Sequence, residues 1–328
     1  MSKANLSTQG IIDLASAYYG SAVLFAAVEH DIFTRVEKGE AGLAEQRGMR
    51  LLLDACVAIG LLGKSPDGAY SNTSAGRASL VAGSPADLTK AILYNRDVYP
   101  LWGKLPQFAA TGKPVEKPGI HLGEDPSRTR RFALSMRSRA FAIGRSVVPL
   151  IDLAGCTRLL DLAGGPGTYA ELLARANPGV NFVTVDLPAI SSIAAECVAE
   201  AGMAGRVECV AGDYHTITFP PGSFDAVTIF GALHQESPEQ ITCILKNAAT
   251  ALKPGGRVFV LDMMTDSTHT APAFSALFAV NMALTTDNGW VFSDDELKGW
   301  LREAGFTPGP TTPLPPPMPH WLATGTKI

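Results

Sequence analysis

The sequence has no excess of charge of either sign. Its 328 residues include 27 Lys or Arg and 31 Asp or Glu, which gives a formal net charge of −4. The first 85 residues hold seven basic and eight acidic side chains. A protein that binds nucleic acid through its phosphates needs a basic surface. We therefore expect no nucleic-acid partner.

The sequence also lacks paired cysteines, a leader peptide and a long apolar run. Its five cysteines have no close paired spacing, which argues against a disulfide framework and against a zinc site. The first residues, Met-Ser-Lys-Ala-Asn, are not a basic segment followed by an apolar core. No apolar stretch reads as long enough to span a bilayer. We therefore expect reduced thiols, no bound metal, no membrane partner and a cytoplasmic location.

The first 85 residues read as a small helical domain. Apolar positions recur at helical spacing over residues 11–36 and again over 49–62. Residues 68–73 read as a hairpin tip and strand, and residues 74–81 as a brief helix. This order is typical of a winged-helix module. Because the charge is balanced, we interpret residues 1–85 as a winged-helix-like dimerisation domain rather than a DNA-binding one.

The remainder of the chain divides at about residue 150. Residues 86–150 read as an irregular, aromatic-rich connection followed by a helix over 132–148. Residues 151–328 alternate short apolar runs with helical stretches, the pattern of a parallel sheet in an α/β fold. The predicted strands are 158–162, 181–186, 207–211, 226–230 and 257–262, with helices at 169–176, 190–201 and 238–252. A helix at 294–304, a proline-rich loop at 308–319 and a last strand at 320–327 follow.

A glycine-rich segment follows the first predicted strand. Leu159–Thr168 reads Leu-Leu-Asp-Leu-Ala-Gly-Gly-Pro-Gly-Thr, and glycines here permit a tight turn and close approach of a ligand to the backbone. Asp186 ends the next strand, where an acid is placed to accept hydrogen bonds from ribose hydroxyls. Asp213 ends the third strand, within reach of an adenine amine. We predict that the cofactor is bound by Asp161, Gly164, Gly165, Gly167, Asp186, Leu187, Asp213 and Tyr214.

A dinucleotide cofactor is the main rival interpretation of this segment. Gly165-Pro-Gly-Thr-Tyr-Ala170 satisfies the G-x-G-x-x-G/A pattern of NAD(P)-dependent oxidoreductases. The nucleotide unit begins only after about 155 residues of other material, however, and Asp213 suits adenine better than a second nucleotide half. The chain also ends in a helix and then a strand behind a long loop, which suits the extra antiparallel strand of methyltransferases better than a dinucleotide-binding domain. A non-catalytic winged-helix protein that senses a nucleoside is a further alternative.

Taken together, these segments resemble the small-molecule O-methyltransferase family that includes caffeate, acetylserotonin and bacterial natural-product methyltransferases. The matching segments are 21–33, 51–70, 159–167, 212–214, 233–234, 252–258 and 292–306. The resemblance implies a Rossmann-like class I domain with an antiparallel C-terminal strand, and S-adenosyl-methionine as cofactor. It also implies a homodimer in which the N-terminal domain of one subunit closes over the active site of the other.

The same resemblance assigns catalytic roles. His234 matches the family's catalytic histidine, which would remove a proton from a hydroxyl acceptor, and Asp262 matches one of two acids beside it. The second acid position falls at Val291, and Gln235-Glu236 replaces the usual Asp-Trp. These departures weaken the case for a strong base. They keep open a methyltransferase that acts on sulfur, nitrogen or carbon, with His234 only orienting the acceptor.

The resemblance places the acceptor between the connecting helices and the cofactor. It implies an acceptor pocket lined by Tyr94, Tyr99, Trp102 and Met136. Six arginines crowd into residues 128–145, and Arg137 and Arg139 among them lie next to Met136. Arginine binds carboxylates through two parallel hydrogen bonds, so Arg137 and Arg139 suggest an acidic acceptor. The sequence does not identify that acceptor.

Overall fold

The structure is a computed structural model that describes residues 6–316 and 318–328. The chain forms two compact units, one ending at Tyr99 and the other beginning at Pro100. Residues 1–5 and Pro317 lie outside the described residues. The expected absence of a leader depends partly on residues 1–5, and Pro317 belongs to the expected proline-rich loop.

The N-terminal unit is a set of helices around a small hairpin. Its elements are α1 (Thr8–Ser16), α2 (Tyr18–Glu29), α3 (Ile32–Glu37), α4 (Arg47–Ala58), β1 (Leu62–Lys64), β2 (Tyr70–Asn72) and α5 (Ser74–Ser79). Phe33, Leu53 and Leu62 are fully buried in its core. Asn72 donates a hydrogen bond to the Phe33 carbonyl at 2.9 Å and so ties the hairpin to α3. The single helix expected over 11–36 is wrong, because Asp31 takes a left-handed backbone conformation (φ 53°) that separates α2 from α3.

The first two helices of this unit are unusually apolar and exposed. Thr8–Glu29 spans 22 residues, its most apolar stretch of 18 residues has a mean hydropathy of 1.6, and little of that stretch is buried. By length and composition alone, this segment could cross a membrane, so the expectation that no stretch is long enough to span a bilayer is wrong. One such helix near the N-terminus is weak evidence for a membrane span. Its large exposed side chains are Ile11, Ile12, Leu14, Tyr18 and Tyr19.

The region expected to be an irregular connection is largely helical. It forms α6 (Thr89–Trp102), α7 (Leu105–Thr111) and a short π-helical turn η1 (Ile120–Glu124). Ala91, Val98 and Leu101 are buried at helical spacing along α6, a pattern that the neighbouring aromatic residues obscure.

The long helix α8 (Pro126–Val147) starts before the expected residue 132. Asp125 caps its first turn by accepting a hydrogen bond from the Arg128 backbone N–H at 3.0 Å, and Pro126 occupies a position where its missing N–H costs nothing. These capping residues, rather than the apolar pattern, fix where the helix begins.

The C-terminal unit is a seven-stranded sheet between two layers of helices. Its further elements are η2 (Val148–Leu150), β3 (Arg158–Leu162), α9 (Thr168–Ala176), β4 (Asn181–Asp186), α10 (Pro188–Glu200), β5 (Val207–Ala211), β6 (Phe224–Phe230), η3 (Leu233–Gln235), α11 (Pro238–Ala251), β7 (Leu252–Met263), α12 (Ala273–Ala283), α13 (Asp294–Glu303), β8 (Phe306–Pro313) and β9 (His320–Lys327). The strand order is β5-β4-β3-β6-β7-β9-β8. Strands β3 to β7 pair in parallel, and β9 runs antiparallel to both β7 and β8.

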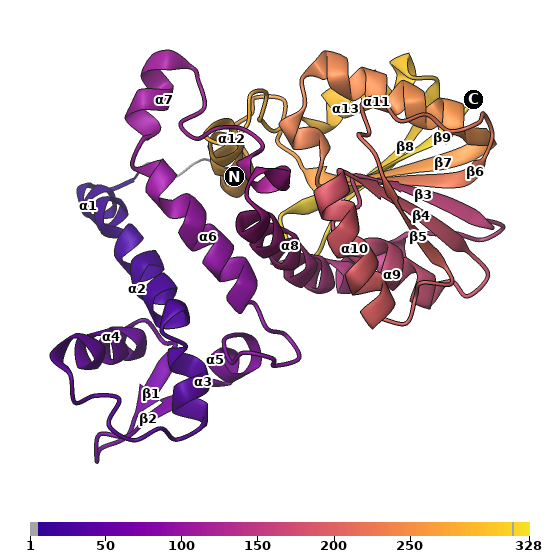
Figure 1. Cartoon of the computed structure of the whole chain (residues 1–328). Helices are drawn as coiled ribbons and strands as arrows, with labels where there is room; N and C mark the ends of the chain where they lie inside the picture. The colour runs from indigo at the N-terminus through magenta and orange to yellow at the C-terminus, as the bar shows by residue number, and fades with distance from the viewer. Residues whose placement is uncertain (1–5, 317) are drawn as a thin grey trace. The chain divides into compact units, whose positions relative to one another are not determined.

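Figure 1 shows α11 and α13 on one face of this sheet and α8, α9 and α10 on the other. The two faces carry separate apolar cores. Leu160, Val260 and Leu297 pack on the α11 and α13 side, while Leu159 and Leu173 pack on the α8 and α9 side. Alternate residues of each strand therefore supply opposite cores, as strand geometry requires. The carboxyl ends of β3, β4, β5, β6 and β7 meet at one edge of the sheet.

The parallel α/β prediction is confirmed, and the first three strands have the expected bounds. The proline-rich loop expected to start at residue 308 is wrong in its first half, since residues 306–313 form β8. Strand β8 pairs only with β9 and lies at the edge of the sheet. Edge strands tolerate proline because one side of the strand needs no hydrogen-bond donors.

Candidate active site

The glycine segment forms a tight loop between β3 and α9. Gly165 and Gly167 adopt left-handed backbone conformations, with φ of 57° and 71°. At Gly164 the reason for glycine is space, because a Cβ there would lie 1.9 Å from the Thr184 Oγ1. The loop thus presents bare backbone at the carboxyl edge of the sheet, as a nucleotide-binding turn does.

Asp161 lies beneath this loop and is almost fully buried. Its carboxylate accepts hydrogen bonds from Thr228 Oγ1 at 2.7 Å and from Thr184 Oγ1 at 3.3 Å. Burial raises the pKa of Asp161 to about 6, against the opposing effect of these two hydrogen bonds. These hydrogen bonds tie the end of β3, just before the loop, to the neighbouring strands β4 and β6. Contact of Asp161 with a cofactor stays a prediction.

Asp186 and Leu187 join the loop from the end of β4. The Asp186 carboxylate accepts hydrogen bonds from the backbone N–H of Gly165 and of Leu187, each at 2.8 Å. Burial outweighs these bonds and raises the pKa of Asp186 to about 6. The structure therefore brings the glycine loop and the predicted ribose acid into direct contact.

Asp213 and Tyr214 follow β5 at the same edge. The Asp213 carboxylate accepts a hydrogen bond from the His215 backbone N–H at 2.9 Å and contacts the His215 ring nitrogen Nδ1 at 2.7 Å. Tyr214 donates a short hydrogen bond to Glu236. Burial opposes ionisation of Asp213, but the contacts with His215 outweigh it and lower the pKa. The Asp213 side chain keeps nearly half of its surface exposed.

His234 lies in η3, just beyond the end of β6. Its ring nitrogen Nδ1 is 2.6 Å from Asp262 Oδ1, and its backbone N–H donates to Asp262 Oδ2 at 3.3 Å. Asp262 is 1% exposed and also accepts a hydrogen bond from the Met263 backbone N–H. The Phe278 ring packs edge-on against the imidazole at 5.0 Å. The pair is therefore held rigidly, with Nε2 as the ring atom not engaged by Asp262.

The position expected for a second acid carries none. Val291 is buried, and its carbonyl accepts a contact from His269 Nδ1 at 3.3 Å. The neighbouring Trp290 backbone N–H donates to the His234 carbonyl at 2.9 Å. The segment before α13 therefore holds the His234 backbone instead of supplying a carboxylate. No group of three or more His, Cys, Asp or Glu side chains that could bind a metal occurs in the described part of the chain.

The predicted acceptor residues are spread over both units. Tyr94 and Tyr99 lie on α6 in the N-terminal unit, and the Tyr99 ring packs against Phe25 at 5.6 Å. Trp102 donates through Nε1 to Asn281 Oδ1 at 3.0 Å. Met136 is half-buried on α8. The role of these four residues at an acceptor pocket stays a prediction.

The two predicted arginines of α8 have different surroundings. Arg137 forms an ion pair with the buried Glu171 at 3.0 Å and lies over the Phe141 ring at 4.9 Å. Arg139 instead acts electrostatically on His320, which also feels the charges of Asp262 and His234. Burial, helped by the charges of His234 and Arg139 and opposed by that of Asp262, lowers the pKa of His320 to about 4. Arg137 is therefore engaged with Glu171, whereas Arg139 acts on His320, which also feels the charges of His234 and Asp262.

Sequence reasoning did not identify three members of this edge. His215 and Glu236 contact each other across 21 residues, and His320 opens the antiparallel strand beside the end of β7, where it pairs with Met263. Two of the three had a signal in the sequence. His215 directly follows the predicted Asp213 and Tyr214. His320 opens the last strand, and an antiparallel strand that follows a parallel one begins at the edge where that strand ends.

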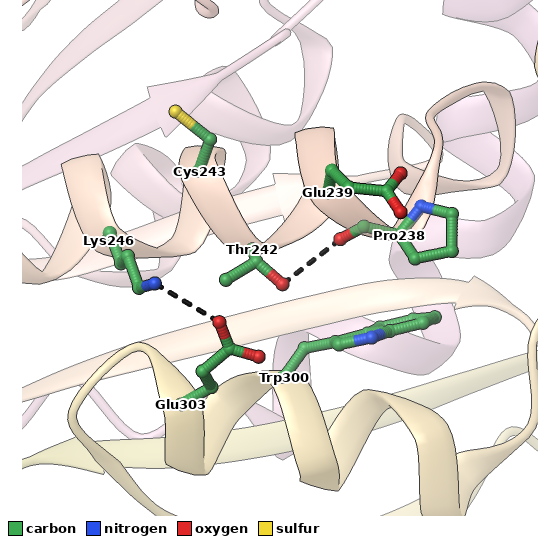
Figure 2. A pocket seen from close by; sticks show the side chains of 7 residues that line it. All are labelled: Pro238, Glu239, Thr242, Cys243, Lys246, Trp300 and Glu303. Carbon is green, nitrogen blue, oxygen red and sulfur yellow. Dashed lines mark hydrogen bonds and ion pairs between the residues drawn. The ribbon is translucent and has the colours of Figure 1, made fainter.

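A cavity of about 420 Å³ lies elsewhere, between α11 and α13 (Figure 2). Its rim carries an ion pair between Lys246 and Glu303 at 3.1 Å, and the Trp300 ring lies beside it. None of the predicted site residues lines it. The candidate active site is therefore the carboxyl edge of the sheet, where the strand ends converge.

Comparison with known families decides the identity. Residues 116–307 match the model of an O-methyltransferase domain, and residues 12–82 match that of an O-methyltransferase dimerisation domain. The chain belongs to the O-methyltransferase family. It is an S-adenosyl-methionine-dependent methyltransferase with a class I fold. The oxidoreductase and nucleoside-sensor alternatives are therefore wrong.

Relatives in this family cover almost the whole chain. The chain is 30% identical to 3-hydroxy-5-methyl-1-naphthoate 3-O-methyltransferase of Streptomyces sahachiroi, over 97% of this chain and 94% of that protein. It is 32% identical to the tetracenomycin polyketide synthesis 8-O-methyltransferase TcmO of Streptomyces glaucescens, over 97% and 96%. Other relatives are named for transfer to nitrogen or to carbon.

A solved structure confirms the fold. Human N-acetylserotonin methyltransferase in complex with SAM has a TM-score of 0.88 at 23% identity, covering 100% of this chain and 99% of that one. The edge described above fits such a cofactor, because Gly164 leaves bare backbone and Asp186 offers a carboxylate beside it.

Proposed function

We propose that this O-methyltransferase methylates a hydroxyl group of a small acidic natural product, with His234 as the general base. The observation that carries the proposal is the contact of 2.6 Å between His234 Nδ1 and Asp262 Oδ1. It orients the ring so that Nε2 is the atom available to take a proton from an acceptor. The buried carboxylate of Asp262 then stabilises the imidazolium that forms.

S-adenosyl-methionine supplies a methyl group on a positively charged sulfur. The residues of the protein therefore need mainly to align the acceptor, remove its proton and exclude water. Asp186 and the glycine loop hold the nucleoside end in this proposal, with Asp213 and Tyr214 at the adenine. His234 lies just after β6, and β6 is the neighbour of β3, the strand that leads into the glycine loop.

The acidic character of the acceptor is supported by two observations. A relative with 30% identity is named for methylating a hydroxynaphthoate, an aromatic ring that carries both a hydroxyl and a carboxylate. In this chain, Arg139 lies within electrostatic range of His320, close to the catalytic pair. We propose that Arg139 binds the acceptor carboxylate, while Arg137 holds Glu171.

The test uses a panel of hydroxynaphthoates, aromatic amines and thiols with labelled S-adenosyl-methionine. A hydroxyl acceptor predicts that His234→Ala lowers kcat by a factor of about 10²–10⁴, the usual contribution of a general base. Near-normal turnover of His234→Ala would show instead that the acceptor is sulfur, nitrogen or carbon. Arg139→Ala should raise KM for an acidic acceptor, whereas the exposed Arg131 on the same helix serves as the matched control.

We also propose that the enzyme is a cytoplasmic homodimer, with residues 1–85 forming the dimerisation domain, 86–150 the connecting helices and 151–328 the catalytic domain. The exposed apolar side chains of α1 and α2 support this, since a surface rich in Ile, Leu and Tyr favours burial against a partner. Light scattering should give twice the mass of the 34.5 kDa chain. Ile12→Asp should shift the population toward monomer, and an unchanged mass would argue against this face.

A further inference from the structure

A network of polar side chains joins the loop after β5 to the loop after β6. Tyr214 OH donates to Glu236 and accepts a hydrogen bond from Gln235 Nε2 at 3.1 Å. The His215 ring stacks on the Tyr214 ring, with centroids 4.4 Å apart. The loop predicted to hold adenine is therefore tied directly to the segment that follows His234.

His215 is the bridge of this network. Its ring contacts Asp213 Oδ1 through Nδ1 at 2.7 Å and Glu236 Oε2 through Nε2 at 2.8 Å. A neutral imidazole has one N–H and one lone pair, so only the protonated ring donates to both carboxylates. Loss of that proton turns one contact into a repulsion between a lone pair and a carboxylate oxygen. With both carboxylates ionised, these two contacts fit only a positively charged His215.

Glu236 gives this bridge its importance, because it is only 5% exposed. A buried carboxylate that loses its cationic partner is left with a large desolvation cost. Its backbone carbonyl also accepts a hydrogen bond from Trp290 Nε1 at 2.8 Å, and the Trp290 backbone N–H donates to the His234 carbonyl. Any movement of Glu236 is thus transmitted to the segment that carries His234.

We propose that protonated His215 is a positioning residue that clamps the adenine end of the cofactor site to the His234 loop, so that cofactor affinity falls when His215 loses its proton. This inference rests on the proposed assignment of Asp213 and Tyr214 to the adenine. It differs from that assignment because His215 acts through its neighbours and need not touch the cofactor.

The direction of the pH effect follows from the charges that face the ring. Burial alone would lower the pKa of His215, but the hydrogen bonds and charges of Glu236 and Asp213 outweigh it and raise the pKa. The third titratable neighbour, Tyr214, stays neutral because burial and the Glu236 charge raise its pKa. The clamp is therefore intact below the ordinary titration range of histidine and is lost as pH rises through the higher folded value.

The experiment is calorimetric titration of the full chain with S-adenosyl-homocysteine between pH 6.5 and 9. Wild type should bind about tenfold more weakly at the alkaline end, which corresponds to one charge-assisted hydrogen bond. His215→Gln should bind about tenfold more weakly at pH 6.5 and lose most of this pH dependence. The ligand's own amine titrates equally in both proteins, so the difference between the two curves isolates His215.

Three further variants make the result decisive. Glu303→Gln removes the exposed ion pair with Lys246 and should leave the wild-type curve unchanged. Glu236→Gln should flatten the curve as His215→Gln does, and it replaces that variant if circular dichroism shows a misfolded chain. Parallel curves for wild type and a folded His215 or Glu236 variant would overturn the clamp. Asp213→Asn should weaken binding, because it removes both a clamp contact and the proposed adenine carboxylate. If wild type bound S-inosyl-homocysteine, which lacks the adenine amine, as tightly as S-adenosyl-homocysteine while the clamp variants still flattened the curve, the adenine assignment alone would be overturned.

Discussion

The space at Gly164 makes a quantitative prediction for Gly164→Ala. A Cβ at this position would lie 1.9 Å from Thr184 Oγ1 and 2.4 Å from Asp161 Oδ2, so the Thr184 hydroxyl must move. Moving it breaks the hydrogen bond that Thr184 donates to the buried Asp161. Overpacking costs about 1–3 kcal/mol, and a buried group left unpaired costs about 1–3 kcal/mol more. We expect the free energy of unfolding to fall by about 2–6 kcal/mol, or Tm by about 4–24 °C for a unit of this size.

Two other glycines provide matched controls for the same substitution. Gly165 has open space around it but a left-handed φ of 57°, so Gly165→Ala should cost about 1–2 kcal/mol from the backbone alone. Gly179 has open space and no left-handed conformation, so Gly179→Ala should be nearly neutral. Thermal unfolding followed by circular dichroism gives the order of the three variants. A Gly164→Ala protein as stable as Gly179→Ala would refute the steric argument.

Three more outcomes follow from the site. Burial raises the pKa of Asp186 to about 6, so affinity for S-adenosyl-homocysteine should fall as pH drops below about 6, and Asp186→Asn should lose this acid limb in calorimetry. Asp262→Asn should lower kcat by about 10²–10⁴, no more than His234→Ala does, while cofactor affinity stays near wild type, because Asp262 contacts the imidazole and the His234 and Met263 backbone but none of the residues assigned to the cofactor. Arg137→Ala should lower the free energy of unfolding by about 2–3 kcal/mol, since it removes a charged partner from the buried Glu171. In the same melting assay, Arg130→Ala, which breaks an exposed pair with Glu196, should cost under about 1 kcal/mol.

Local chemistry made most of the catalytic unit predictable from sequence. The strand over 158–162 is a short apolar run stopped by glycines, and both its bounds and its parallel neighbours are as expected. Asp186 and Gly165 were predicted to share a site because neighbouring parallel strands end at the same edge, and the contact of 2.8 Å between them is observed. Their contact with the cofactor remains a prediction.

Contacts that depend on loop conformation could not be predicted in this way. His215 meets Glu236 because two loops fold toward each other, and no periodic pattern encodes that approach. Arg137 was predicted to bind a substrate carboxylate from its residue type and its place next to Met136, and no sequence pattern indicated its ion pair with Glu171 on the next α-helix along the chain. The helix over 89–102 was missed because its buried positions are obscured by aromatic and proline residues nearby, and the helix over 105–111 buries no side chain, so it has no apolar pattern to detect.

The prolines of β8 have a consequence for the behaviour of the folded protein in concentrated solution. An exposed strand at the border of a sheet is a template on which a second molecule can add a strand of its own. Pro308, Pro310 and Pro313 remove the amide hydrogens that such an intruding strand would need. The edge strand β8 therefore offers fewer backbone N–H donors to an added strand, and this edge of the sheet resists growth into intermolecular aggregates.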